Sequence, residues 1–355
     1  MNDLERRDRL VAWFTAGHRD LPWRQTRDPW AIWVSEVMLQ QTRATSVIPY
    51  YHRFLERFPT PAALASAPLD DLLAFWAGLG YYARARHLHR AATEVVERHG
   101  GVVPRDPEAF GALTGVGRYT AGAVLSIAFG VPAPLVDGNV VRVLTRWDRL
   151  SGDPRRPPLQ GALWERARAL ANGPTPGALN QALMELGATV CTPRSPSCLL
   201  CPVAEGCAAR AAGDPERYPR KAERPERPVE RFVAALVETD EGIWLVRRPE
   251  TGLLAGLWEL PMVDAGEPGG LAALGLEPLT REGTGRTIVH AFTHRVWHVE
   301  VVRATGRPDA VRWPAARQVP GDALADAGLT GPALKALHAW RVDGAPRRRG
   351  AGRLR

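Results

Sequence analysis

The chain has 355 residues, of which 45% are hydrophobic and 24% are charged, and it carries a formal net charge of +8 at pH 7. This composition excludes a collagen, a disordered protein and a disulfide-rich mini-protein, and the length favours two domains over a single core. The excess of basic residues favours a partner that bears phosphates or presents another anionic surface.

Helical spacing of apolar residues extends from residue 3 to about residue 190, with proline and glycine separating the segments. Residues 208–230 are rich in proline and in charges of both signs, which predicts a linker. Three later segments predict strands and a fourth predicts a helix: 232–237, 243–246 and 296–302, then 334–340. The arginine-rich end, 342–355, predicts a disordered basic tail, which either adds salt-sensitive nonspecific binding or is only a solvated extension.

The beginning of the chain carries acidic residues and lacks the apolar stretch of a secretory signal. No run reaches the roughly 18 consecutive apolar residues that a membrane helix needs. We therefore expect a cytoplasmic protein with no membrane partner, in a compartment that keeps thiols reduced.

All four cysteines fall in one short segment with the spacing C-x6-C-x2-C-x5-C: Cys191, Cys198, Cys201 and Cys207. The prolines between them exclude a regular helix and predict a loop wrapped around a bound group. In a reduced compartment, clustered thiols bind metal more often than they form disulfides. Four thiolates can hold zinc or an iron–sulfur cluster, and the spacing alone leaves both open.

A short glycine-containing segment, Gly115, Val116 and Gly117, separates two predicted helices at 107–113 and 118–128. Two glycines around one apolar residue allow a tight hairpin with positive φ, which leaves backbone N–H groups and the start of the next helix facing outward. Such a hairpin suits a DNA phosphate. An ordinary turn between helices is the alternative.

Two carboxylates are candidates for catalysis. Glu36 lies on a helical segment among mostly apolar neighbours, and partial desolvation raises the pKa of a glutamate so that it can act as a general acid near neutral pH. The alternative is a buried glutamate paired with Arg24 or Arg43. Asp137 opens another helical stretch, where it can be an N-cap and a catalytic residue at once.

Taken together, seven motifs in a fixed order resemble the adenine DNA glycosylases of the MutY family, in the helix-hairpin-helix superfamily that also contains endonuclease III. The motifs occupy residues 21–24, 35–42, 78–86, 113–121, 136–140, 180–185 and 191–207. The resemblance implies a multi-domain protein whose first domain is an all-α helix-hairpin-helix glycosylase domain. That domain, 1–207, would hold a 4Fe-4S cluster on the four cysteines of 191–207. A linker (208–230), an α+β Nudix-like domain (231–341) and the basic tail (342–355) would follow.

The resemblance also implies an activity: a base excision repair enzyme that hydrolyses the N-glycosidic bond of adenine opposite 8-oxoguanine or guanine in double-stranded DNA. The sequence does not show the oligomeric state, and we expect a monomer because DNA enzymes of this size commonly act alone. By this likeness Glu36 protonates adenine, and ionised Asp137 stabilises the resulting cation, with Tyr119 and Asn139 positioning Asp137 and water. The remaining candidates are Trp23, Arg24 and Gln181 around the adenine, Gln41 and Tyr81 as wedges in the DNA stack, and the hairpin residues Gly115, Val116 and Gly117. For Tyr81 the alternative is packing against Arg84 or the core.

Tyr119 occupies the hairpin position where endonuclease III-type enzymes carry a lysine that forms a Schiff base. Only two of the 46 basic residues are lysines, Lys221 and Lys335, so the first 220 residues contain no amine nucleophile of this kind. We therefore expect a monofunctional glycosylase. An oxidised-pyrimidine glycosylase of the endonuclease III type is the alternative, and Tyr119 disfavours it. Thr114 stands where the family usually has proline, which we expect to loosen the hairpin.

In the C-terminal part, residues 247–250 and 256–261 carry the likeness to Nudix hydrolases, but the acidic metal-binding helix does not follow Pro261. A reader of the opposite base is therefore expected, rather than a nucleotide hydrolase. Phe292, Thr293 and His294 match the family's Phe-Ser-His loop for 8-oxoguanine, and threonine keeps the hydroxyl group. A core Phe292 and a solvated His294 are the alternative. A non-enzymatic DNA-binding protein is disfavoured by the presence of both Glu36 and Asp137.

Overall fold

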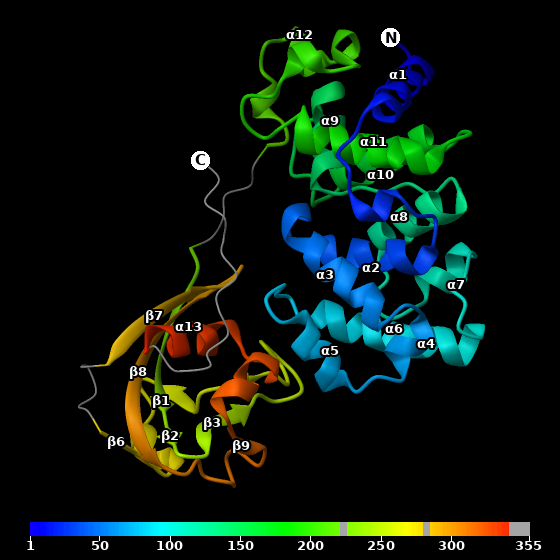
Figure 1. Ribbon diagram of the computed structural model, residues 1–355. Helices are drawn as coiled ribbons and strands as arrows, with labels where there is room; N and C mark the ends of the chain where they lie inside the picture. The colour runs from blue at the N-terminus through cyan, green and yellow to red at the C-terminus, as the bar shows by residue number, and fades with distance from the viewer. Residues whose placement is uncertain (221–225, 280–284, 341–355) are drawn as a thin grey trace. The chain divides into compact units, whose positions relative to one another are not determined.

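The computed structural model describes residues 1–220, 226–279 and 285–340 (Figure 1). The chain forms two compact units: Met1–Ser66 with His87–Arg224, and Ala67–Arg86 with Pro225–Arg355. The expected order of a helical part followed by an α+β part is confirmed. No helix of the described residues is long and apolar enough to cross a membrane.

The regular elements of the first unit are all helical in the described residues, and short 3-10 helices are labelled η. They are α1 (Asp3–Ala16), η1 (Pro22–Arg24), α2 (Pro29–Leu39), α3 (Ala44–Arg57), α4 (Pro61–Ala65), α6 (Ala83–His99), α7 (Pro107–Gly111), α8 (Arg118–Phe129), α9 (Gly138–Trp147), α10 (Leu159–Ala171), α11 (Pro176–Thr189), η2 (Cys198–Leu200), η3 (Ala204–Gly206), α12 (Ala208–Ala211) and η4 (Pro215–Arg217). α5 (Leu69–Trp76) and the first turn of α6 belong to the segment that groups with the second unit.

Helix α2 is the central helix of the first unit. Asp28 caps its N-terminus by accepting hydrogen bonds from Trp30 and Ala31, and Pro29 occupies its first position, where a missing N–H costs nothing. Every residue from 30 to 38 is buried, because α2 packs against α3 and α8. α11 packs in turn against α1, α8 and α9 (Figure 1). Side chains on α2, α8 and α11 therefore approach one another inside the unit.

Residues 208–220, the first part of the predicted linker, pack against the first unit. Ala209 on α12 is fully buried, and Tyr218 is only 9% exposed. The Arg146 guanidinium donates to the Tyr218 carbonyl at 3.0 Å, which fastens this segment to α9. Proline and charge patterns mark irregular chain, but two apolar side chains and one buried arginine are enough to fold it onto a neighbour.

The second unit contains two sheets and a covering helix. Its strands are β1 (Val229–Leu236), β2 (Glu238–Thr239), β3 (Gly242–Arg247), β4 (Trp258–Glu259), β5 (Met262–Asp264), β6 (Leu276–Pro278), β7 (Arg286–Ala291), β8 (Val296–Gly306) and β9 (Ala316–Val319), with η5 (Gly270–Leu274), η6 (Gly321–Asp326) and α13 (Gly331–Ala339). The larger sheet has the order β5-β1-β8-β6, with β7 also paired to β8. The smaller has the order β2-β3-β4, with β9 paired to β3.

β1 runs parallel to β8, whereas the other pairs of the larger sheet are antiparallel. α13 contacts β7 and β4, and the apolar faces of both sheets contribute to one core with it (Figure 1). The three predicted strands and the predicted C-terminal helix are present, with ends shifted by a few residues. Between β5 and β6 the described chain forms only η5, so no acidic helix stands in the place where Nudix hydrolases bind their metal.

Candidate active site

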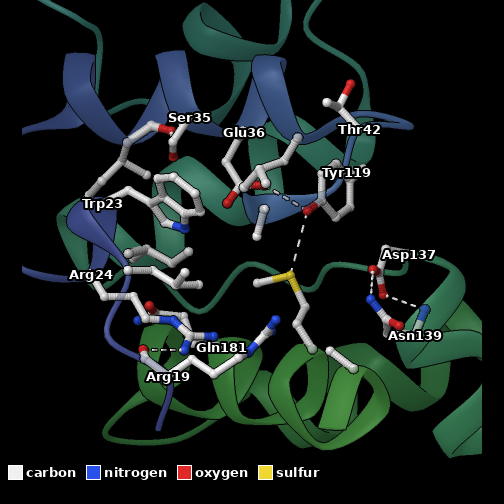
Figure 2. Close-up of a pocket in the computed structure, with 17 residues that line it drawn as sticks. Arg19, Trp23, Arg24, Ser35, Glu36, Thr42, Tyr119, Asp137, Asn139 and Gln181 are labelled. Atoms are coloured by element: carbon white, nitrogen blue, oxygen red, sulfur yellow. Dashed lines mark hydrogen bonds between the residues drawn. The ribbon is translucent and has the colours of Figure 1, made fainter. Parts of the chain in front are cut away.

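One cavity of about 210 Å³ in the first unit brings together residues that lie far apart in the sequence (Figure 2). Seven of the predicted site residues line it: Trp23, Arg24, Glu36, Tyr119, Asp137, Asn139 and Gln181. They come from η1, α2, α8, α11 and the beginning of α9. Glu36 and Asp137, about a hundred positions apart in the chain, thus share a pocket.

Glu36 projects from α2 and is only 4% exposed. The Tyr119 hydroxyl donates to Glu36 Oε2 at 2.6 Å. The pKa of Glu36 is raised to about 7: burial is the main cause and the nearby Asp137 adds to it, while the Tyr119 hydrogen bond and the Arg24 charge act in the opposite direction. Glu36 therefore exists substantially as a neutral acid near pH 7.

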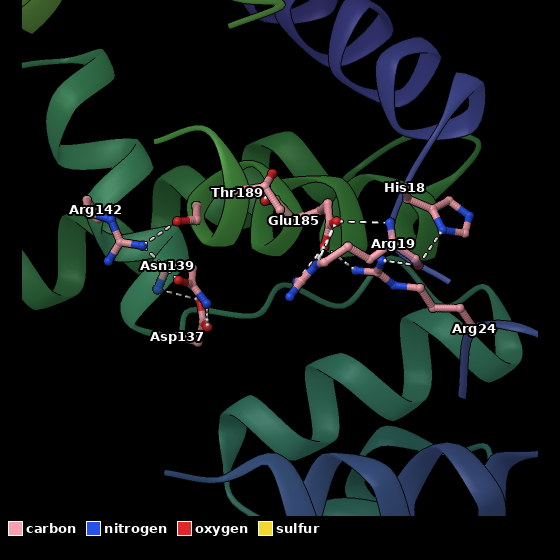
Figure 3. A network of polar contacts seen from close by, with 9 residues as sticks. His18, Arg19, Arg24, Asp137, Asn139, Arg142, Glu185 and Thr189 are labelled. Atoms are coloured by element: carbon pink, nitrogen blue, oxygen red, sulfur yellow. Dashed lines mark hydrogen bonds and ion pairs between the residues drawn. The ribbon is translucent and has the colours of Figure 1, made fainter. Parts of the chain in front are cut away.

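The alternative in which Arg24 neutralises Glu36 is not what the structure shows. Arg24 Nη2 donates to Glu185 Oε2 at 2.8 Å, and Arg19 Nη2 donates to the same oxygen at 2.7 Å (Figure 3). Burial acts to raise the pKa of Glu185, but the hydrogen bonds from the two arginines outweigh it and lower this pKa to about 2. Glu185 is thus a charged, paired carboxylate, whereas a pKa of about 7 leaves a substantial fraction of Glu36 protonated near neutral pH.

Asp137 is the N-cap of α9. Its carboxylate accepts hydrogen bonds from the backbone N–H groups of Asn139 at 2.9 Å and Val140 at 2.7 Å, and from Asn139 Nδ2 at 2.8 Å. Burial raises the pKa of Asp137, and these three hydrogen bonds counteract the burial by stabilising the charged form. The cap and the proposed catalytic group are one and the same side chain.

Asn139 is itself held in place. Arg142 Nη2 donates to Asn139 Oδ1 at 2.8 Å and to the Gly187 carbonyl at 2.6 Å (Figure 3). A Cβ at Gly187 would lie 2.5 Å from Asn139 Cβ, so only glycine lets α11 come this close to the beginning of α9. The position of the amide that bonds Asp137 is therefore set by packing as well as by hydrogen bonds.

Tyr119 contacts a different carboxylate from the one expected. The resemblance implies that it positions Asp137, but its hydroxyl donates to Glu36 and lies 3.5 Å from Met184 Sδ. The reason is that α8 packs directly against α2, which carries Glu36. Asn139, by contrast, does bond Asp137.

Trp23 and Gln181 lie on the cavity wall, as Figure 2 shows. Trp23 is buried and meets Tyr51 edge to face at 5.5 Å between ring centroids. Gln181 Nε2 donates to the Gly177 carbonyl at 3.3 Å, a long bond that leaves the side-chain oxygen of Gln181 for another donor.

Sequence reasoning missed the pairing of Arg19 with Glu185. The available signal is that Glu185 stands among apolar residues on a helix and so needs a cationic partner.

The hairpin residues lie directly before α8, and Gly117 is the N-cap of this helix. Gly115 has φ +76°, and a Cβ there would approach His87 Cβ to 2.5 Å, so this position requires glycine. Gly117 has φ −90° and is extended, so the positive φ of the hairpin is at Gly115. As the N-cap of α8, Gly117 has no side chain to bond the first N–H groups of the helix, which is the property that suits an anion.

Thr114, which we expect to loosen the hairpin, makes contacts of its own. Its backbone N–H donates to Glu94 Oε2 at 2.8 Å, and its hydroxyl donates to Glu94 Oε1 at 2.5 Å. A proline at this position would have neither donor. The threonine is therefore fastened to α6 by two hydrogen bonds.

The two proposed wedge residues both have left-handed backbones. Gln41 follows α2 with φ +58° and is exposed. Tyr81 follows α5 with φ +50° and is 44% exposed. The Arg84 guanidinium lies 5.3 Å from the centroid of the Tyr81 ring, so the packing alternative is also seen in part. Non-glycine residues with positive φ are uncommon and gather at functional sites.

The proposed reader residues occupy the turn between β7 and β8. Phe292 is half-buried, packs on the core of its unit and meets the Trp297 ring edge to face at 4.9 Å. Thr293 and His294 are exposed at the tip of the turn. The Thr293 hydroxyl shares a hydrogen bond with the Tyr81 hydroxyl at 3.1 Å. Phe292 thus has the core contact of the alternative interpretation, and His294 is solvent-exposed as that interpretation also expects.

The four cysteine thiols surround a second cavity, next to α9. Arg146 Nη1 donates to Cys191 Sγ at 3.3 Å, so a positive charge faces the site. In the described ranges, no three Cys, His, Asp or Glu side chains converge as they would on a single metal ion. A 4Fe-4S cluster fits such a cavity, because each of four separated irons takes one thiolate. The zinc alternative needs the thiols closer together.

Comparison with known proteins assigns each part of the chain. A family model described as HhH-GPD superfamily base excision DNA repair protein matches residues 34–169. Models described as the iron-sulfur binding domain of endonuclease III and as a NUDIX domain match residues 191–207 and 232–339. The iron-sulfur model, together with the relatives described below, identifies the cysteine loop as a 4Fe-4S site.

The adenine DNA glycosylase of Rattus norvegicus is 40% identical, over 81% of this chain and 68% of that protein. The adenine DNA glycosylase of Homo sapiens is 42% identical, over 72% of this chain and 57% of that protein. The solved structure of a thermostable thymine-DNA glycosylase superposes with a TM-score of 0.53 and 32% identity, over 59% of this chain and 97% of that chain. The chain thus spans between about half and two thirds of the length of these two curated relatives.

Proposed function

Because the chain belongs to the adenine DNA glycosylase family, we propose that it hydrolyses the N-glycosidic bond of adenine paired with 8-oxoguanine or guanine in double-stranded DNA. One observation carries the proposal. Glu36, whose burial raises its pKa to about 7, lines the same cavity as Asp137, a carboxylate that accepts three hydrogen bonds. A neutral acid beside a charged carboxylate is what acid-assisted cleavage of a glycosidic bond requires.

Adenine inside a duplex cannot reach a cavity within the protein, so the nucleotide must leave the stack, at a cost of roughly a few kcal/mol that a mispair lowers. Gln41 and Tyr81 would take the vacated place in the stack, and the hairpin at Gly115 and Gly117 would bind the backbone phosphate. Trp23 would then contact the face of the purine, while Arg24 and Gln181 would meet its edge with polar groups.

Adenine departs poorly as an anion. Glu36 would donate its proton to adenine N7 while the bond between N9 and the sugar C1′ breaks, so that the base leaves as a neutral molecule. Asp137 would stabilise the oxocarbenium ion left at C1′, or bond to it transiently. Water then attacks C1′ and gives a proton to the Glu36 carboxylate, which restores the acid. The products are free adenine and an abasic site in an intact strand.

The iron–sulfur cluster has no proposed part in this chemistry. When bound, it would hold the 191–207 loop in one conformation through its four thiolates. Arg142 joins this loop to the site, because its Nε donates to the Cys191 carbonyl at 2.7 Å while its Nη2 bonds Asn139.

The proposal is tested with labelled duplexes that pair adenine with 8-oxoguanine, guanine or thymine, and with a thymine-glycol duplex and free nucleotide. We expect alkali-dependent nicking of the adenine strand opposite 8-oxoguanine and guanine alone. Borohydride is expected to trap no covalent complex with DNA, since Tyr119 cannot form an imine. Release of thymine glycol together with efficient trapping would show an endonuclease III-type enzyme instead.

We also propose that the enzyme acts as a monomer, in the cytoplasm, on nucleoid DNA.

The rate of adenine excision is expected to fall as the pH rises through about 7, because only protonated Glu36 can donate to the base. Tyr119→Phe removes a hydrogen bond that stabilises the charged carboxylate, so the pKa of Glu36 rises and the alkaline limb moves to higher pH. Single-turnover rates across the neutral range measure both effects. A limb that stays in place or moves to lower pH in the variant would contradict the assignment of Glu36 as the acid.

A further inference from the structure

The turn between β7 and β8 is a two-residue hairpin loop whose conformation is not set locally. Phe292 N–H donates to the Arg295 carbonyl at 2.9 Å, which makes Thr293 and His294 the two loop residues. Two-residue hairpins favour turns with positive φ, because these match the twist of the strands. Neither Thr293 nor His294 is among the described residues with positive φ. Contacts from outside the loop must therefore hold it.

One such contact reaches the loop itself: the Tyr81 hydroxyl and Thr293 Oγ1 share a hydrogen bond at 3.1 Å. The contacts to the residues that flank the loop come from the beginning of β1. Glu230 lies opposite Trp297 in the parallel pairing of β1 with β8. Its Oε1 accepts from Arg295 Nη1 at 2.7 Å, and its Oε2 accepts from Trp297 Nε1 at 2.6 Å. One carboxylate oxygen is thus bonded to Arg295, which directly follows the loop, and the other to Trp297, two residues further on in β8.

The other end of the loop is reached indirectly. Trp297 is 3% exposed, and its ring supports Phe292 at 4.9 Å. The Phe292 carbonyl also accepts from Arg227 Nη1 at 3.1 Å. Glu230 therefore fixes Arg295 on one side of Thr293 and His294 and, through Trp297, supports Phe292 on the other. The Glu230 and Arg295 side chains are about one third exposed, and Thr293 and His294 at the loop tip are exposed as well.

We propose that Glu230 is a positioning residue that sets the preference for 8-oxoguanine over guanine opposite adenine. This inference rests on the proposed function of Phe292, Thr293 and His294 as the reader of the opposite base. Glu230 touches no substrate: it acts by holding the loop in the conformation that presents Thr293 and His294. A loop released from Glu230 samples other conformations and loses contacts with 8-oxoguanine, whereas chemistry at Glu36 is unchanged.

The test compares single-turnover rates of adenine excision from A:8-oxoguanine and A:guanine duplexes. Glu230→Gln is expected to lower the ratio of the two rates by about tenfold, the order of effect of one charge-assisted hydrogen bond, with the rate on A:guanine unchanged. Arg295→Gln is expected to lower the ratio too, and the double variant no further than the larger single effect, because both changes break the same contact.

Glu238→Gln is the matched control, since Glu238 also pairs with an arginine, Arg303, at 3.4 Å in the same unit but away from the loop. A ratio in Glu230→Gln within experimental error of wild type overturns the inference, as does an equal fall in Glu238→Gln or independent effects in the double variant. If Glu230→Gln lowers the thermal midpoint, Arg295→Gln becomes the test, because it leaves the bond between Glu230 and Trp297 in place. A lower ratio in Arg295→Gln then supports the inference, and an unchanged ratio overturns it. Wild-type protein with equal rates on both duplexes would contradict the proposed reader itself.

Discussion

Replacing Glu36 by glutamine is expected to lower the single-turnover rate of adenine excision by about 10²–10⁴-fold, the usual contribution of a general acid. Glutamine has nearly the same shape and can still accept the hydrogen bond from the Tyr119 hydroxyl. What it lacks is the proton that Glu36 holds near neutral pH. Because the site buries this group, no water molecule from bulk solvent readily replaces it as the donor.

The control for this change is Glu97→Gln, which makes the same substitution at an exposed position on α6. It is expected to cleave at the wild-type rate. The affinity of the Glu36 variant for a duplex with adenine opposite 8-oxoguanine should stay within a few-fold of wild type, which separates binding from chemistry. Near wild-type cleavage by Glu36→Gln would show that the acid is another group.

Replacing Asp137 by asparagine is expected to lower the excision rate by about 10²–10³-fold, the size of effect seen when one group that stabilises transition-state charge is removed. Asparagine caps a helix as well as aspartate does, so α9 keeps its beginning. The variant therefore removes the negative charge that faces the developing cation, with little change in the fold.

Asp106→Asn is the matched control, because Asp106 caps α7 in the same way, by accepting from Ala109 N–H at 2.8 Å. Similar small changes in thermal midpoint are expected for the two variants, with loss of excision only in Asp137→Asn. If both variants retain activity, the Asp137 carboxylate serves the helix alone.

Much of the fold could be predicted from the sequence, but the short strands could not. Apolar spacing predicts helices that bury one or more faces, and the first unit consists of such helices. β4 and β5 have two and three residues, too few to show the alternation that marks a strand. β7 was not predicted either: of its six residues only Ile288 is buried, so it gives no alternating pattern. Its pairing with β8 becomes visible only in three dimensions.

The site divides in a similar way. The order of the motifs identifies Glu36, Asp137 and their neighbours as candidate site residues. Their separation of about a hundred residues in the sequence does not predict which side chains contact one another in the fold. The partner of Glu185 illustrates this limit, since any of the 44 arginines was a candidate and two of them, Arg19 and Arg24, bind it together. The direction of the Tyr119 hydroxyl likewise depends on how α8 packs on α2, which no local pattern encodes.

The left-handed backbones of Gln41 and Tyr81 have a consequence for evolution of this protein. Each conformation destabilises the free fold by on the order of 1 kcal/mol, and glycine would relieve this at either position. Yet in the proposed role of these residues as wedges, a side chain that is already fixed loses less conformational freedom when it binds the duplex. Selection for thermal tolerance and selection for repair would thus oppose each other at these two residues.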